Sequence, residues 1–154
     1  MSVLDYGDTI YRHASASTLK PLDSMYHSAL RFITCDSYST HHCTLYEKVG
    51  WTSLTVRRNR HWLLFIYKTL NGHLPSYISS LLNWSNSHHF TRSSDWLTLE
   101  VPRANTELGK TAFSFCAAHT WNTLQQTLKL NTLVSVGLFK IMITNYSTLK
   151  CNCF

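Results

Sequence analysis

Apolar residues recur at every third or fourth position along several stretches of the chain, which is the spacing of one helix face. In the first stretch, Ser17 or Thr18 is placed to cap the helix and Pro21 falls in its first turn. The apolar positions of this stretch are Leu19, Leu22, Tyr26, Ala29, Leu30 and Ile33. The pattern predicts a first helix of about 16 residues.

Two more helices are predicted in the first half of the chain. The shorter covers 43–49 and ends at Gly50, a residue type that favours a left-handed stop. The longer has the strongest helical pattern in the sequence, with Ser53 as its expected N-cap and Asn71-Gly72 as its end. Its apolar stripe contains Trp62, Phe65, Ile66, Thr69 and Leu70.

The pattern changes after this helix. Pro75 fits the first turn of a short helix over 76–82, and the polar residues 83–94 predict a hinge. Apolar and polar residues then alternate over 96–101, which is the two-residue period of a half-buried strand. Residues 112–115 are its expected partner. The sequence thus predicts one small β-hairpin element among the helices.

Helical spacing returns near the C-terminus, in one pattern that starts at Ala117 and in another that starts at Val136. The predicted fold class is mainly α, a small helical domain with a minor β-hairpin element, and α+β at the margin. We expect a helical segment over 1–82, and a segment over 83–154 that holds the β element and the C-terminal helices. The two segments form separate lobes or pack as one domain.

Composition narrows the class of protein. Apolar residues make up 44% of the chain and aromatic residues 13%, which favours a packed core over disorder. The longest apolar run, Trp62–Tyr67, is far shorter than the ~18 residues of a membrane span. Residues 1–10 lack the basic-then-apolar order of a secretory signal. We therefore expect an intracellular protein, cytoplasmic or nuclear, with no membrane partner.

The chain carries a formal net charge of +6, which favours an anionic partner such as nucleic acid. Its densest basic cluster, Arg57, Arg58 and Arg60, falls in the first turns of the longest predicted helix, where the helix dipole favours acids instead. Together with Lys68, these guanidinium groups could grip a phosphate backbone. The alternative is that they only solvate one face of the helix.

Catalytic chemistry finds little support in the sequence. Asp5 and Asp8 are the one close pair among eight acidic residues, and without a third acid they are interpreted as a solvated turn or cap. Cys116 and His119 lie one helical turn apart, but a buried thiol is the expected role of this cysteine. The scattered glycines match no phosphate-binding loop. We expect no catalytic residue and no cofactor.

The five cysteines are expected to be reduced, because the count is odd and no secretory signal is recognised. Cys151 and Cys153 stand at the very end of the sequence, and Cys35 lies near the His41-His42-Cys43 run. Neither group completes the four ligands of a structural zinc site, and the second would need a distant histidine. We expect a buried thiol beside polar loop histidines and no metal site.

Short motifs along the chain occur in an order that is similar to one known family. They are Asp5-Tyr6-Gly7-Asp8, His27-Ser28-Ala29-Leu30-Arg31, Gly50-Trp51, Arg57-Arg58, Tyr67-Lys68-Thr69-Leu70-Asn71-Gly72, Thr91-Arg92-Ser93-Ser94, Val101-Pro102-Arg103, Gly109-Lys110-Thr111-Ala112-Phe113 and Trp121-Asn122-Thr123-Leu124. With these motifs the chain resembles the C-terminal portion of LINE-type non-LTR retrotransposon polyproteins, of the kind abundant in fish genomes, downstream of the reverse transcriptase palm. The resemblance runs from Asp5 to Lys140.

The resemblance implies a thumb-like segment over 1–82 that works with the remainder of a reverse transcriptase, an RNA-directed DNA polymerase, in the intact family protein. The aromatic-Ala-Asp-Asp motif of the palm and the endonuclease domain have no counterpart in the sequence. The chain is therefore expected to be a non-catalytic fragment of a transposable element. Its implied activity is contact with template and primer, as RNA or an RNA–DNA hybrid, through Arg57, Arg58, Arg60 and Lys68.

Two other functions stay open at this point. The first is a small helical protein-interaction module in which the faces around Trp62 and Trp121 bind a partner helix. The second is a decayed transposon remnant with no function, which would show as poor solubility or a molten state.

Overall fold

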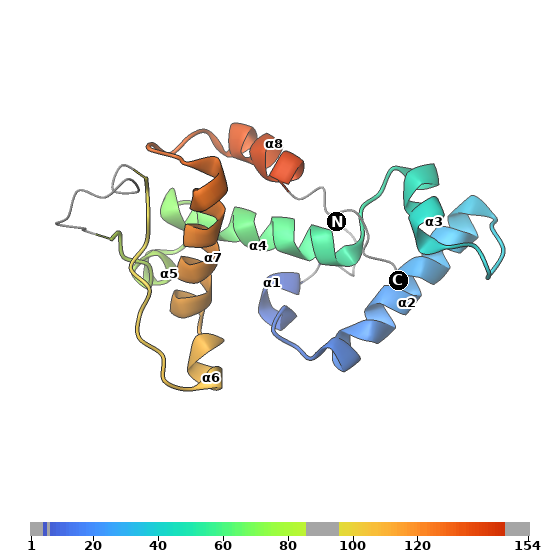
Figure 1. Ribbon diagram of the computed structural model, residues 1–154, viewed down its shortest axis with the longest axis horizontal. Coiled ribbons are helices and arrows are strands. Elements are labelled where there is room, and N and C mark those ends of the chain that lie inside the picture. The colour runs from blue at the N-terminus through green and yellow to red at the C-terminus, as the bar shows by residue number, and fades with distance from the viewer. Residues whose placement is uncertain (1–4, 6, 86–95, 147–154) are drawn as a thin grey trace. The chain divides into compact units, whose positions relative to one another are not determined.

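Helices account for most of the chain in the computed structural model (Figure 1), which describes residue 5, residues 7–85 and residues 96–146. The helices are α1 (Asp8–Tyr11), α2 (Ala16–Thr34), α3 (His42–Val49), α4 (Leu54–Leu70), α5 (Ser76–Ser79), α6 (Glu107–Lys110), α7 (Phe113–Leu128) and α8 (Val136–Tyr146). The chain is therefore mainly α, as the sequence predicted. Within the described ranges, no helix is both long and apolar enough to span a membrane.

The described residues form two compact units. The first contains the residues up to His61 together with Tyr146, and the second is Trp62–Asn145. The division falls inside α4, whereas the boundary predicted from the sequence lies between residues 82 and 83. The physical reason is that the apolar stripe of α4 beyond residue 61 packs into one core with α7 and α8.

The first unit is built around α2 and α3. The side chain of Ser15 caps α2 by accepting a hydrogen bond from the Thr18 backbone N–H at 3.3 Å, so the helix begins earlier than the predicted caps allowed. As a result, Pro21 lies inside the helix, beyond its first turn. The core of this unit consists of Tyr26, Leu30, Leu45 and Leu54. The predicted helix over 43–49 is confirmed as α3.

The second unit is built around a stack of aromatic rings. The rings of Tyr67 and Phe139 are stacked with centroids 3.8 Å apart, and Tyr67 also stacks on Trp121 at 6.0 Å. The Tyr67 hydroxyl donates a hydrogen bond of 2.5 Å to the carbonyl of Val134, which satisfies its polar end inside the core. Of the apolar stripe predicted on α4, Trp62, Ile66 and Thr69 are buried, and Phe65 and Leu70 pack against the core, whereas Tyr67 was not part of that prediction.

The predicted β element is smaller than expected and has a different partner. The strand predicted over 112–115 is wrong, because Phe113 begins α7 and packs edge-on against Trp62 with ring centroids 5.7 Å apart. Among the described residues, extended pairing is limited to one antiparallel bridge, Trp84 with Leu99, flanked by a 2.9 Å bond from the Glu100 N–H to the Asn83 carbonyl. Most of the predicted hinge over 83–94 lies outside the described residues.

Side chains of α7 take the place of the missing strand. Asn122 bonds both backbone groups of Leu99, each at 2.8 Å, in the manner of a neighbouring strand. The indole N–H of Trp121 donates to the Leu97 carbonyl at 2.6 Å, and the Gln125 amide donates to the same carbonyl at 3.0 Å. Side chains on one face of α7 therefore form hydrogen bonds with the backbone of the extended segment around residues 97–99.

The other predicted helices are present with changes at their ends, whereas α1 and α6 were not predicted. Ser53 caps α4, with a bond of 3.4 Å from the Val56 N–H to its hydroxyl. The helix predicted over 76–82 is confirmed as the shorter α5, directly after Pro75. The pattern that was predicted to start at Ala117 belongs to α7, which starts earlier, and α8 begins at Val136 as predicted.

Candidate nucleic-acid interface

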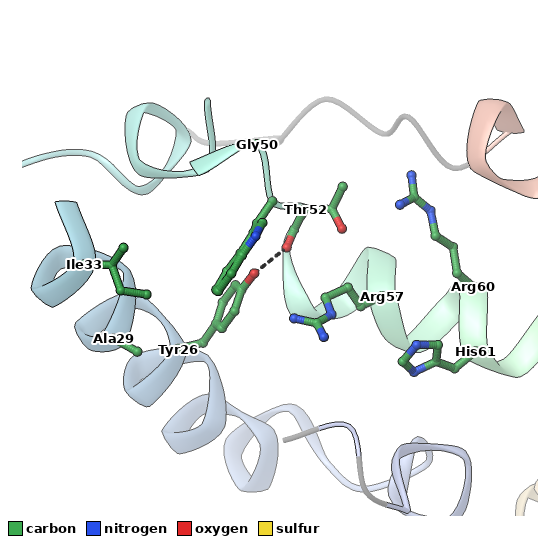
Figure 2. A pocket seen from close by; sticks show the side chains of 9 residues that line it. Tyr26, Ala29, Ile33, Gly50, Thr52, Arg57, Arg60 and His61 are labelled. Atoms are coloured by element: carbon green, nitrogen blue, oxygen red, sulfur yellow. Dashed lines mark hydrogen bonds between the residues drawn. The ribbon is translucent and has the colours of Figure 1, made fainter. Parts of the chain in front are cut away.

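A cleft of about 690 Å³ opens in the first unit between α2, the loop after α3 and the start of α4. Figure 2 shows its walls from close by. The lining residues are Tyr26, Ala29 and Ile33 from α2, Gly50, Trp51 and Thr52 from the loop, and Arg57, Arg60 and His61 from α4. Every lining residue belongs to the first unit.

The aromatic part of the cleft is placed by the end of α3. Gly50 adopts a left-handed conformation with φ 67°, which a side chain would strain, and this turn ends the helix. The next backbone N–H, that of Trp51, bonds the Tyr46 carbonyl at 3.1 Å. Trp51 is thereby laid over Tyr26, with ring centroids 6.4 Å apart and an angle of 14° between the planes.

The two stacked rings differ in exposure. Tyr26 is only 3% exposed, and its hydroxyl donates a 2.9 Å hydrogen bond to the carbonyl of Thr52, a contact drawn in Figure 2. Trp51 stays 46% exposed, although it lies on a buried ring. A half-exposed indole held flat by a buried tyrosine is a surface on which another flat ring can stack.

The structure brings only part of the predicted basic cluster into the cleft. Arg57 and Arg60 line it, and the Arg57 guanidinium lies 6.0 Å from the centroid of the Tyr26 ring. Arg58 bonds the Asp23 carboxylate at 3.1 Å, and its side chain is only 10% exposed. Lys68 belongs to the second unit. The cationic wall of the cleft therefore consists of Arg57 and Arg60, with His61 beside them.

The interpretation of Asp5 and Asp8 as a solvated turn or cap is wrong. Both residues are buried, at 6% and 4% exposure, and they face the first turns of α4. The Asp5 carboxylate pairs with Arg57, and the Asp8 carboxylate pairs with the imidazole of His61. Because these partners are one helical turn apart on α4, the two acids bind neighbouring positions of one face.

These two contacts orient the side chains of the cleft wall. Held by Asp5, the Arg57 guanidinium keeps a fixed position beside the aromatic rings, and part of its charge is neutralised. Tyr11 lies nearby, and its pKa is raised by burial and by the Asp8 carboxylate. Trp51, Tyr26 and His61 were not predicted as site residues. Only the Gly50-Trp51 pair carries a signal in the sequence, a glycine stop followed by an aromatic residue.

A second group of polar side chains lies where α2 meets α3. The His27 ring stacks on the His42 ring at 5.0 Å, and its Nε2 atom lies 2.6 Å from the hydroxyl of Tyr46. Burial and the neighbouring His42 lower the pKa of His27, and burial and His41 lower that of His42. Burial also raises the pKa of Tyr46 to about 12.

The cysteines of the described residues have separate roles. Cys35 ends α2 in a left-handed conformation and its thiol lies 3.9 Å from the Phe32 carbonyl, so it does not join the histidines as the sequence had allowed. The Cys116 thiol donates to the Lys110 carbonyl at 2.6 Å, while His119 stacks on Phe115. Cys116 and His119 thus have different neighbours, and this geometry gives no support to a nucleophile and base pair.

No known protein family, curated protein or solved structure matches the chain.

Proposed function

We propose that the chain is a non-catalytic nucleic-acid contact module, and that the cleft of the first unit holds RNA or the single-stranded part of a template and primer. The observation that carries the proposal is the half-exposed Trp51, stacked on Tyr26 beside Arg57 and Arg60. An unpaired base can stack on the indole, while guanidinium groups bind the phosphates on either side of that base.

The electrostatics of the chain agree with this proposal. The net charge of +6 attracts a polyanion over a long range. The two cleft arginines are placed to contact its phosphates. Arg60 supplies this charge from α4, where it lines the cleft together with Arg57 and His61. Contact by phosphate and stacking is independent of base sequence, which is what a template and primer grip requires.

The motif resemblance gives the proposal its biological setting. In an intact LINE-type polyprotein, such a module would follow the reverse transcriptase palm and hold the template strand near the polymerase. Trp62 and Trp121, the two residues on which the protein-interaction alternative rests, are buried at 4% and 0% exposure, which favours the cleft as the contact surface. The cleft, unlike the faces around Trp62 and Trp121, presents a half-exposed aromatic ring beside cationic side chains.

The proposal is tested by fluorescence anisotropy with a labelled RNA–DNA hybrid that carries a single-stranded RNA overhang, at several salt concentrations. Replacing Arg60 by Gln is expected to weaken binding and to reduce the slope of log K against log salt by about 1. Arg57 and Arg58 are poorer choices, because replacing them leaves the carboxylates of Asp5 and Asp23 without their partners.

The matched control is Arg103→Gln, the same change at an exposed arginine of the second unit. This variant is expected to keep the slope of the unmodified chain. Equal slopes for Arg60→Gln and Arg103→Gln would show that any binding is diffuse attraction to a basic protein. Binding that does not depend on salt would exclude a phosphate contact altogether.

A further inference from the structure

Three consecutive side chains with metal-binding atoms converge at the start of α3. His41 is the N-cap, with an extended backbone (φ −65°, ψ 139°), and His42 and Cys43 are the first two residues of the helix. Because the backbone turns from extended to helical between them, neighbouring side chains reach the same side. One ligand atom from each of the three residues lies within 4.8 Å of the other two.

The imidazoles of this group are held in place by packing. His42 lies between two rings, His41 at a centroid distance of 4.2 Å and His27 of α2 at 5.0 Å. His27 is in turn fixed by its contact with the Tyr46 hydroxyl at 2.6 Å. A neutral imidazole has the lone pair that a metal ion needs.

We propose that His41, His42 and Cys43 bind a zinc ion through two imidazole nitrogens and one thiolate. Two nitrogens and one sulfur suit a borderline-soft cation such as Zn²⁺ and do not suit Mg²⁺ or Ca²⁺. Zinc bonds of about 2.0–2.1 Å to nitrogen and about 2.3 Å to sulfur place tetrahedral ligand atoms roughly 3.3–3.8 Å apart. The ligand atoms lie within 4.8 Å of one another, so binding has to draw them closer together. On binding, the Cys43 thiol releases its proton.

The arrangement fits an open site better than a structural one. The three ligands are consecutive in the sequence, so a bound ion closes no long loop and adds little to the stability of the fold. A structural zinc has four protein ligands, whereas three protein ligands leave the fourth position to water or another small ligand. The Tyr46 hydroxyl already bonds His27 Nε2, which keeps this nitrogen away from the fourth position.

The test uses Co²⁺ as a spectroscopic substitute for zinc, titrated into the reduced chain. The expected result is one equivalent of Co²⁺ with a thiolate-to-cobalt charge-transfer band and the intense ligand-field bands of a four-coordinate site, displaced by Zn²⁺. Cys43→Ser should abolish the charge-transfer band. His41→Asn, which keeps a good N-cap residue, should weaken Co²⁺ binding at least ~10-fold while circular dichroism shows the helices intact.

Other cysteines provide the controls. Cys35→Ser and a Cys151→Ser, Cys153→Ser double variant should keep the band, because neither changes a proposed ligand. A band that survives in Cys43→Ser, or that is lost in the double variant alone, would overturn the assignment. So would a His41→Asn variant that binds Co²⁺ as tightly as the Cys35→Ser control does.

Discussion

Gln125 is a buried polar side chain with both ends of its amide satisfied. It is 1% exposed, its Nε2 donates to the Leu97 carbonyl at 3.0 Å, and its Oε1 accepts from the Leu130 N–H at 2.8 Å. Replacement by Leu leaves the buried Leu130 N–H without an acceptor. We expect Gln125→Leu to lower the free energy of unfolding by about 1–3 kcal/mol, measured by urea denaturation.

Gln126 offers a matched control, since it is the next residue of α7 and is exposed. The same substitution there, Gln126→Leu, is expected to change the stability by no more than about 0.5 kcal/mol. If the two variants have the same free energy of unfolding, the hydrogen bonds of the Gln125 amide to Leu97 and Leu130 do not stabilise the fold.

At the scale of residues, the sequence identified the basic cluster but not its partners. Arg57 and its acid are separated by 52 positions, and His61 and its acid by 53. Local spacing gives no sign of such pairs, because they depend on how α1 packs against the start of α4 within the first unit. The burial of Asp5 and Asp8 could therefore not be predicted from the sequence. The clustering of the arginines on one helix could be predicted, because it follows from local spacing.

At the scale of elements, the connection between α2 and α3 carries an ion pair that responds to acid. The Lys48 ammonium lies 2.5 Å from the Asp36 carboxylate, and hydrogen bonds from Lys48 and Thr34 lower the pKa of this carboxyl. A carboxyl with a lowered pKa in the folded state stabilises the fold above its unfolded-state pKa of about 3.9. This contribution is lost as the pH falls through the folded-state value.

The expected outcome is measurable by NMR titration of the Asp36 side-chain carboxyl. Its midpoint should lie below that of an unfolded aspartate and should rise towards it in Lys48→Gln, because the larger of the two hydrogen-bond contributions comes from Lys48. Glu107→Gln serves as a control, since it removes another exposed ion pair, with Lys110, and should leave the Asp36 midpoint unchanged. An unchanged midpoint in Lys48→Gln would contradict the pairing.

Helices were predictable as elements because their apolar stripes repeat over several turns. The start of α7 was instead predicted as a strand over 112–115, because Phe113, Ser114 and Phe115 alternate between apolar and polar residues. The choice between helix and strand for these residues depends on the packing of Phe113 against Trp62 and Phe65, with ring centroids 5.7 and 5.8 Å apart. Tertiary packing of this kind is invisible in a short pattern.

At the scale of the whole molecule, the two units have cores of very different size. Among the residues that the structure describes, twelve buried residues form the core of the second unit and four form that of the first. Because stability follows buried apolar area, amide hydrogen exchange should be slower in α7 than in α2 and α3, by at least about tenfold. Equal exchange rates would contradict this difference, and rapid exchange throughout would favour a molten remnant.

The central claim is that nucleic acid stacks on Trp51 in the cleft of the first unit. Its most direct test compares Trp51→Ala with Trp84→Ala, an equivalent change at a 40% exposed tryptophan of the second unit, on hybrids with and without a single-stranded overhang. Loss of one stacked base should weaken binding to the overhang by about 1–3 kcal/mol, or roughly 5- to 150-fold in Kd, in Trp51→Ala alone. Equal affinities for the two variants, each shown to be folded by circular dichroism, would contradict the account.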